Sequence, residues 1–257
     1  MTALPLRLPV KNGVLILAKL FVVGIGPGEY EQMTIKAVNT IKNCSVIAGY
    51  TVYCDLIKKY FPEKEYISSA MKKEKDRCRL AFESAKDKDT ALVCSGDPGV
   101  YALAGLAIEM SKDYDSVQLE IVPGVTAALS GGAFLGSPLG HDFALISLSD
   151  LLTPLDLIKK RIRLAAEGDF AICIYNPSSI KRAEYLKTAC EIMLEFKDKN
   201  TVCAVVKNIG RDGEEKKIMT LGELKDYKAD MFTTVFVGNS KTYVVNGFMV
   251  TPRGYVI

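Results

Sequence analysis

Short, continuously apolar runs alternate along the chain with longer segments whose apolar residues recur at helical spacing. Residues 20–25 and 91–94 are apolar throughout, which is typical of strands buried on both faces of a sheet. Residues 33–42 carry Ile35, Val38 and Ile41 on one helical face. Further strands are expected at 45–48, 117–122, 143–147, 170–175, 201–206, 216–220 and 233–238, and further helices at 73–86, 101–110, 127–135, 154–166 and 179–196. This alternation predicts an α/β protein with mostly parallel or mixed sheets.

A segment dense in helix and strand breakers, residues 136–140, interrupts this pattern, and the pattern restarts beyond it. We therefore expect two α/β domains of similar size, at 20–138 and 139–257, with a hairpin or extended tail at 243–257. Residues 1–19 form an N-terminal extension to which we assign no role. Their apolar run is too short for a signal peptide or a membrane span.

Three loops rich in glycine and proline follow expected strands of the first domain. They are Gly24-Ile-Gly26-Pro27-Gly28, Ser95-Gly96-Asp97-Pro-Gly and Pro123-Gly124, and Thr126 follows the last as a potential helix cap. Ligands of open α/β sheets bind at the carboxyl ends of the strands. We expect the first two loops to close on one small molecule, and the helix cap at the third leaves its backbone groups able to meet an adenine or carboxylate edge.

The loops fit neither a dinucleotide nor a phosphate site. Glu29 stands where a dinucleotide fingerprint needs a small residue, and Pro27 has no amide proton to offer a pyrophosphate. The second loop lacks lysine, and Asp97 would repel phosphate. Asp97 suits an acceptor for hydroxyl or ammonium groups; the equal alternative is an Asp-Pro-Gly turn in which it only caps the next helix.

Composition excludes several further classes. Net charge is +3, and the densest basic segment, residues 72–79, is interleaved with acids and is interpreted as a solvated helix face, so no nucleic-acid partner is expected. Seven scattered cysteines without a CxxC pair, and a single histidine, His141, predict buried thiols and no protein-bound metal. We expect a cytoplasmic protein without a membrane partner. No nucleophile motif occurs, and adjacent His141 and Asp142 favour a structural over an acid–base role.

The motifs VGIGPG (23–28), SGDPGVY (95–101) and PGVTA (123–127) together resemble the tetrapyrrole (corrin/porphyrin) methyltransferases. The resemblance covers residues 20–257. Longer blocks resemble the members that act on precorrin-3B or cobalt-factor III: Gly49-Tyr50 with Tyr53, HDFALISLSDLLTP (141–154), YNPSSIKR (175–182), GNS (238–240) and TPRGY (251–255).

The resemblance implies a ligand cleft between the two domains that holds S-adenosylmethionine, and a homodimer. By motif, the cofactor contacts would be Pro27, Ser95, Gly96, Asp97, Val100, Tyr101, Thr126, Ala127 and Asn176. Ser95 replaces a frequent glycine of the family, and Ala102-Leu103 replaces Gly-Met, which alters the shape of the pocket slightly. A sulfonium donor is cationic, so a carboxylate and the lack of a phosphate cradle suit it.

The reaction implied is methylation of C17 of a precorrin-3B or cobalt-factor III type precursor with ring contraction, in cobalamin biosynthesis. Methyl transfer needs alignment more than a base, whereas the contraction calls for proton transfer, for which His141, Asp150 and Tyr50 are the catalytic candidates. Arg182, Arg253 and Tyr53, with Lys181, are candidates for binding the substrate.

Two alternatives stay open. The chain could methylate another acceptor, such as a different corrin carbon, uroporphyrinogen or a protein side chain, or it could carry a tetrapyrrole or nucleotide without catalysis. Whether the substrate contains cobalt is undecided by the sequence.

Overall fold

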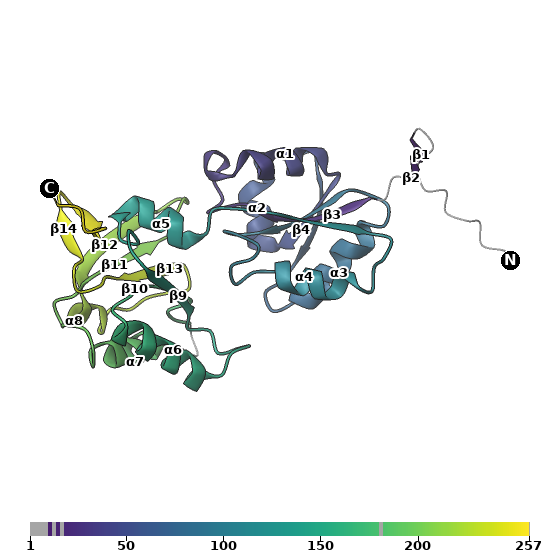
Figure 1. Ribbon diagram of the computed structural model, residues 1–257. Helices are drawn as coiled ribbons and strands as arrows, with labels where there is room; N and C mark the ends of the chain where they lie inside the picture. Colours follow the sequence, from purple (N-terminus) through teal and green to yellow (C-terminus); the bar gives the residue numbers. More distant parts are fainter. Residues whose placement is uncertain (1–9, 12–13, 16–17, 180–181, 257) are drawn as a thin grey trace. The chain divides into compact units, whose positions relative to one another are not determined.

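A computed structural model describes residues 10–11, 14–15, 18–179 and 182–256 of the chain. These residues form two compact units that divide between Thr126 and Ala127 (Figure 1). Of the expected extension, Val10–Lys11 (β1) and Val14–Leu15 (β2) pair antiparallel. The remainder of the extension, up to residue 17, lies outside the described residues, as does the substrate candidate Lys181.

The first unit is built on a five-stranded parallel sheet in the order β5-β4-β6-β3-β7. Its strands are β3 (Lys19–Gly24), β4 (Val46–Tyr50), β5 (Glu65–Ser69), β6 (Thr90–Cys94) and β7 (Gln118–Val122). Its helices are α1 (Ile35–Asn43), α2 (Thr51–Lys58), α3 (Glu74–Ser84) and α4 (Ala104–Ser111), with a 3-10 turn at Tyr30–Gln32.

Alternating residues of the central strands explain the layering of this unit. On β3, Leu20 and Val22 pack against α3 and α4, whereas Val23 packs against α1 and α2. The same alternation continues on β6. Because side chains of a strand point to opposite faces in turn, a continuously apolar run is the pattern that both covered faces require. Figure 1 shows the two helix pairs on opposite sides of the sheet.

The second unit is built on a mixed sheet in the order β12-β11-β13-β10-β9, in which only the β9–β10 pair is parallel. Its strands are β9 (Phe143–Ser147), β10 (Ala171–Tyr175), β11 (Val202–Lys207), β12 (Glu215–Thr220) and β13 (Thr233–Val237). A small second sheet contains β14 (Tyr243–Val245), β15 (Phe248–Val250) and β8 (Gly136–Ser137). The prediction of an α/β protein with parallel and mixed sheets is confirmed.

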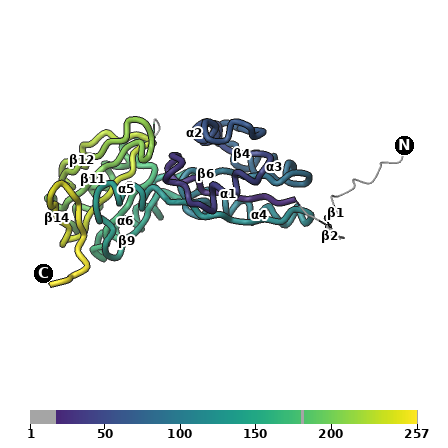
Figure 2. The backbone as a smooth tube through the Cα atoms, turned by 90° about the horizontal axis from the view of Figure 1, so that it is seen from above, coloured from purple at the N-terminus to yellow at the C-terminus, as the bar shows by residue number. Residues whose placement is uncertain are grey.

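Helices cover both faces of this mixed sheet. Helices α6 (Leu155–Glu167), α7 (Tyr185–Met193) and α8 (Leu221–Leu224) pack on one face. Helix α5 (Ala127–Leu135) packs on the other face, where Gly131 closely approaches the ring of Phe236 of β13. Both views place α5 against this sheet (Figures 1 and 2). Residues 127–138, assigned to the first domain on sequence grounds, thus belong to the second unit, where β8 pairs with β15.

Several elements depart from the sequence pattern. Helix α7, Tyr185–Met193, is much shorter than the expected 179–196. Helix α2 and strand β5 were not expected. The segment at 72–79 is not wholly solvated: Arg77 is only 5% exposed, and its Nε donates to Ser69 Oγ at 3.0 Å. That prediction was wrong for this residue because the guanidinium faces the end of β5.

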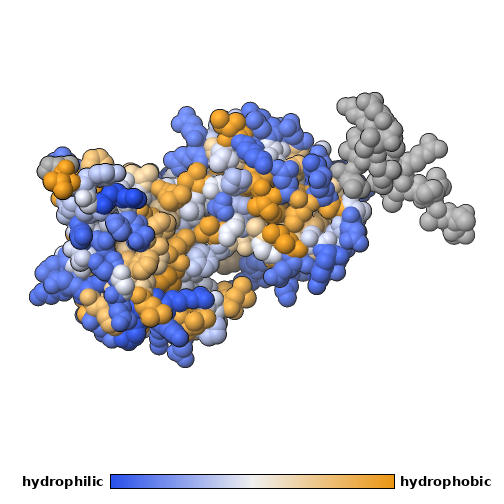
Figure 3. All heavy atoms as spheres, in the orientation of Figure 1, coloured by the Kyte–Doolittle hydropathy of each residue, from blue (hydrophilic) through white to orange (hydrophobic). Residues whose placement is uncertain are grey.

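The surface of both units mixes charged and apolar residues. In Figure 3, orange apolar groups lie among blue hydrophilic ones on the visible face of each unit. Scattered exposed apolar side chains of this kind are normal on a folded protein. Among the residues that the structure describes, no helix has the length and apolar character needed to cross a bilayer.

All seven cysteines are free and buried, as predicted. Burial raises the pKa of the Cys44 thiol to about 12 and that of the Cys78 thiol to about 11. Since the thiolate is the reactive form, both burial and the raised pKa make these thiols unreactive in the folded protein.

We therefore expect Ellman's reagent to modify almost no thiol of the native protein at pH 8. A pKa of about 11 leaves roughly one thiol in a thousand ionised at that pH. Unfolding in guanidinium chloride should release all seven thiols to the reagent. Rapid modification of several thiols without unfolding would contradict the packing described above.

Candidate functional site

Loops after three adjacent strands meet at the carboxyl edge of the parallel sheet in the first unit. Beyond β3 and β6, Ile25 N donates to Cys94 O at 2.9 Å. Gly26 and Gly96 then exchange two backbone hydrogen bonds, of 3.1 and 2.7 Å, as an antiparallel bridge. The first two glycine-rich loops predicted from the sequence are therefore joined directly through their backbones.

The third loop packs onto this bridge at a distance that excludes any side chain. A Cβ atom on Gly124 would overlap the carbonyl oxygen of Gly96, and one on Gly24 would lie 2.6 Å from the same oxygen. Gly96 itself has φ of 72°, a conformation that side chains disfavour. Glycine is required at these three positions by close backbone approach and turn geometry.

The Asp97 carboxylate forms hydrogen bonds within this three-loop site, which consists of the loops at 24–28, 95–99 and 123–126. Its Oδ1 accepts the Gly99 amide at 2.8 Å, and its Oδ2 accepts the Gly124 amide at 3.0 Å. The expected Asp-Pro-Gly turn is present, but Asp97 caps no helix, since α4 begins only at Ala104 and has no side-chain cap. Asp97 instead joins the second loop to the third.

Thr34 adds a link that the sequence analysis missed. Its Oγ1 accepts the Ala37 amide at 3.0 Å as the cap of α1, and its hydroxyl donates to Pro123 O at 3.1 Å. The start of α1 is thereby tied to the third loop. A threonine directly before a helical pattern is a sequence signal for the cap, but not for the contact with Pro123.

The first unit brings seven of the expected cofactor residues to this edge. Pro27 is buried, and Tyr101 is 59% exposed with φ of 52°. The other five residues are partly buried: Ser95, Gly96, Asp97, Val100 and Thr126. Tyr50 ends β4 of the same sheet, and Tyr53 lies in α2, which follows it. The centroids of their two rings are 5.1 Å apart in an edge-to-face arrangement, and the guanidinium of Arg77 lies 5.6 Å from the Tyr50 ring.

In the second unit, the carboxyl ends of β9 and β10 carry another set of expected residues. Asn176 follows β10, and its Nδ2 donates to Ser147 Oγ at 2.9 Å. Ala127 begins α5, and the next amide, of Ala128, donates to Tyr175 Oη at 2.6 Å. The start of α5 is thus fastened to the end of β10.

Asp150 and Arg182 lie together beyond the same strand ends. Tyr185 Oη donates to Asp150 at 2.8 Å, and the Arg182 guanidinium is 3.7 Å from the other carboxylate oxygen. The hydrogen bond to Asp150 raises the pKa of Tyr185, which therefore stays protonated at neutral pH. A catalytic candidate and a substrate-binding candidate are neighbours here.

His141 lies away from Asp150 and Arg182. It precedes β9, whereas Asp150 follows it, so roughly 13 Å of strand separates the two positions. His141 Nδ1 accepts the Asp142 amide at 2.8 Å and lies 3.4 Å from the Asp142 carboxylate. Arg253 lies on the His141 side, where both residues line a small hollow at the amino ends of β9 and β10. The sequence-predicted catalytic residues of this unit therefore divide between the two ends of β9.

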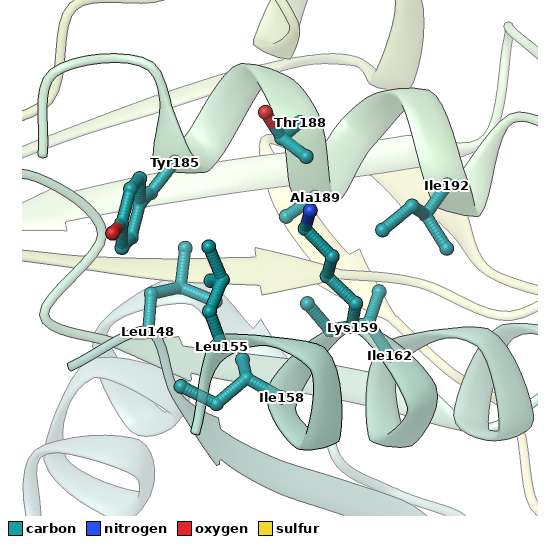
Figure 4. Close-up of a pocket in the computed structure, with 9 residues that line it drawn as sticks. All are labelled: Leu148, Leu155, Ile158, Lys159, Ile162, Tyr185, Thr188, Ala189 and Ile192. Carbon is teal, nitrogen blue, oxygen red and sulfur yellow. The ribbon is translucent and has the colours of Figure 1, made fainter. Parts of the chain in front are cut away.

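A separate hollow between α6 and α7 has the dimensions of a packing groove. Its volume is about 60 Å³, far below that of usual ligand pockets, which hold roughly 300–1,000 Å³. Figure 4 shows mostly aliphatic side chains lining it, with the polar ends of Tyr185, Lys159 and Thr188. Within the described ranges, no three side chains of His, Cys, Asp or Glu gather as a metal site would require.

Comparison with known proteins defines the class to which this fold and site belong. Residues 19–225 match the family model for Tetrapyrrole (Corrin/Porphyrin) Methylases. The chain belongs to this family, which confirms the resemblance drawn from its motifs.

Three relatives show which members of the family this chain is similar to. The chain is 43% identical to the probable cobalt-factor III C(17)-methyltransferase of Salmonella typhimurium, over 93% of this chain and 100% of that protein. It is 37% identical to the precorrin-3B C(17)-methyltransferase of a Sinorhizobium species, over 92% and 96%. The crystal structure of the methyltransferase CobJ superposes with a TM-score of 0.84 at 32% identity, covering 91% of this chain and 100% of that one.

A more distant structure shares the fold. The uroporphyrin-III C-methyl transferase of Thermus thermophilus, solved in complex with S-adenyl homocysteine, has a TM-score of 0.66 at 20% identity, over 86% of this chain and 92% of that one.

The close approach of the three loops yields a stability prediction. Gly124→Ala should lower the free energy of unfolding by about 1–3 kcal/mol, because the methyl group forces the third loop away from Gly96. Chemical denaturation measures this loss.

The matched control is Gly105→Ala in α4, where an added Cβ has nothing within 4 Å. It should be neutral or stabilise the protein by up to ~1 kcal/mol, since alanine favours a helix over glycine. Equal effects of the two variants would contradict the proposed packing of the loops.

Proposed function

We propose that this protein transfers a methyl group from S-adenosylmethionine to C17 of a cobalt-factor III or precorrin-3B type precursor, with ring contraction, in cobalamin biosynthesis. The observation that carries this proposal is the likeness, at 43% and 37% identity over nearly the full length of both partners, to relatives named for that reaction. The similarity to CobJ across the whole of that chain supports it.

The chemistry of the three-loop site supports the donor. The loops at 24–28, 95–99 and 123–126 carry no lysine or arginine and one carboxylate, Asp97. Each carboxylate oxygen of Asp97 accepts one hydrogen bond from a backbone amide. A carboxylate oxygen can accept more than one, so Asp97 can also accept a hydrogen bond from a ribose hydroxyl or an ammonium group. The site therefore suits a cationic nucleoside better than a phosphate. The uroporphyrin-III C-methyl transferase of Thermus thermophilus, which shares this fold, was solved in complex with S-adenyl homocysteine.

We propose that nine residues hold the donor. Seven come from the first unit and two, Ala127 and Asn176, from the second. They are Pro27, Ser95, Gly96, Asp97, Val100, Tyr101, Thr126, Ala127 and Asn176. When bound, the sulfonium group supplies an activated methyl.

The protein's part in methyl transfer is positioning. The Gly26–Gly96 bridge and the two hydrogen bonds of Asp97 hold the loops to one another through the protein's own groups. Such preorganisation lowers the barrier by aligning donor and acceptor and excluding water. An electron-rich ring carbon is nucleophilic enough to attack without a base, which fits a site that lacks a catalytic triad.

Ring contraction needs groups that move protons, for which we propose Asp150, Tyr50 and His141. Asp150 is held by Tyr185 and lies near Arg182, so it combines a proton acceptor with a cation that can bind a substrate carboxylate. Tyr53, edge-on to Tyr50, is proposed to contact the macrocycle. Arg253 is proposed to bind a carboxylate. We further propose that the protein acts as a cytoplasmic homodimer without nucleic-acid or membrane partners.

The activity is tested with the purified protein, S-adenosylmethionine and cobalt-factor III under anaerobic conditions. One S-adenosylhomocysteine should form for each tetrapyrrole consumed, and mass spectrometry should show a product one methyl group heavier. A parallel reaction with cobalt-free precorrin-3B decides whether the metal is required. Turnover of uroporphyrinogen alone would identify a different methylase, and donor binding without turnover of any tetrapyrrole would identify a carrier.

The role of Asp97 is tested by Asp97→Asn. The amide cannot accept both backbone hydrogen bonds, and the three loops lose their one carboxylate, so calorimetry should show binding of S-adenosylmethionine weakened by about tenfold or more. Asp113→Asn, an exposed change of the same charge, is the control and should bind like the wild type. Unaltered donor affinity in folded Asp97→Asn would remove Asp97 from the donor site.

A further inference from the structure

A small hollow of about 230 Å³ lies in the second unit, at the amino ends of β9 and β10. Its walls come from the segments before these two strands, from the turn after β13 and from the chain after β15. Three of the sequence blocks singled out above supply residues to it: the block beginning at His141, the GNS block and the TPRGY block. None of these lining residues belongs to the proposed donor site.

Buried Thr251 connects two walls of this hollow, the chain before His141 and the chain before Arg253. A Cβ atom on Gly140 would overlap Thr251 O, so only glycine lets the chain before His141 pack against the chain before Arg253. The Thr251 hydroxyl donates to Pro138 O at 2.6 Å and lies 2.7 Å from the Thr242 hydroxyl. His141 and Arg253 are therefore neighbours by construction.

Hydrogen bonds also hold the third wall, the turn after β13 that contains Lys241. Asn239 Oδ1 accepts the Lys241 amide at 3.0 Å, which closes the turn. Ser240 then anchors the turn to Asp169, donating from its hydroxyl at 2.6 Å and from its amide at 2.9 Å. The hollow is thus formed without a ligand.

Its charge balance is positive. Burial raises the pKa of Asp169, but hydrogen bonds from Ser240 and Lys197 outweigh this effect and lower it overall, so Asp169 is ionised. That charge is matched by the buried Lys197, 3.1 Å away. Of the remaining charged groups lining the hollow, Lys241 and Arg253 are cationic, and Asp142 is an acid whose side chain is 80% exposed.

His141 adds a hydrogen-bond donor to these cations. Its Nδ1 accepts the Asp142 amide, so the neutral ring must carry its proton on Nε2. In this state the free edge of the imidazole donates. This N–H is a hydrogen-bond donor for an anionic oxygen.

We propose that His141, Lys241 and Arg253 form a binding site for a single carboxylate or phosphate group. The volume of about 230 Å³ is below the usual range for whole ligands, roughly 300–1,000 Å³, and suits one anionic group rather than a macrocycle. Arginine with a second cation and an N–H donor is the set that recognises such oxygens. The group belongs either to an acidic side chain of the tetrapyrrole, which rests on the proposed function, or to a free anion, which does not.

The site is tested by nuclear magnetic resonance, because His141 is the only histidine of the chain. In tag-free protein, its imidazole signals are followed as inorganic phosphate replaces chloride at constant pH and ionic strength. We expect a saturable shift in the wild type and a dissociation constant about tenfold higher in Arg253→Gln. Arg161→Gln, an exposed change of equal charge on α6, should bind phosphate like the wild type. A shift that does not saturate, or equal weakening in both variants, would overturn the proposal.

A second arm identifies the source of the group. Phosphate that raises KM for cobalt-factor III in the wild type, but not in Arg253→Gln, assigns the site to a carboxylate of the substrate. Saturable phosphate binding that leaves KM unchanged assigns it to a free anion. Because the first arm needs no turnover, the anion site can fail while the methyl transfer stands, and the reverse.

Discussion

Backbone contact among Gly24, Gly96 and Gly124 is the constraint on which the first unit's functional edge depends. Three loops after adjacent parallel strands approach so closely that a single methyl group would separate them. The Asp97 carboxylate then joins the second loop to the third through two amide hydrogen bonds. The three loops thus bring together backbone groups and one carboxylate without a lysine or arginine among their own residues, and the proposed donor site rests on this chemistry.

The second unit uses a different device to position its polar groups. Strands β9 and β10 run parallel, so the residues that precede them gather at one end and those that follow gather at the other. Asp150 and Asn176 lie at the carboxyl end, and His141 lies at the amino end with Arg253. Each end is stabilised by its own hydrogen bonds. Residues close in sequence, such as His141 and Asp150, therefore lie in separate chemical environments.

Most of the fold could be predicted from local pattern. Helix α5 and strand β9 have the bounds expected from the sequence. Strand β5 was missed because its sequence, EYISS, is half polar and it lies at the edge of the sheet. Arg77 was misjudged because a charge within a basic helix gives no sign that the end of β5 will bury it.

The sequence by itself determined the fold class, the family and the three glycine-rich loops, because periodicity and short motifs are local and survive without knowledge of contacts. Only the tertiary structure decided what those residues touch. It showed that Asp97 bonds Gly124, that Thr34 reaches Pro123, and that His141 belongs with Arg253 instead of Asp150. Strand order and register set such pairings between distant segments, and neither is written in the spacing of residues along the chain.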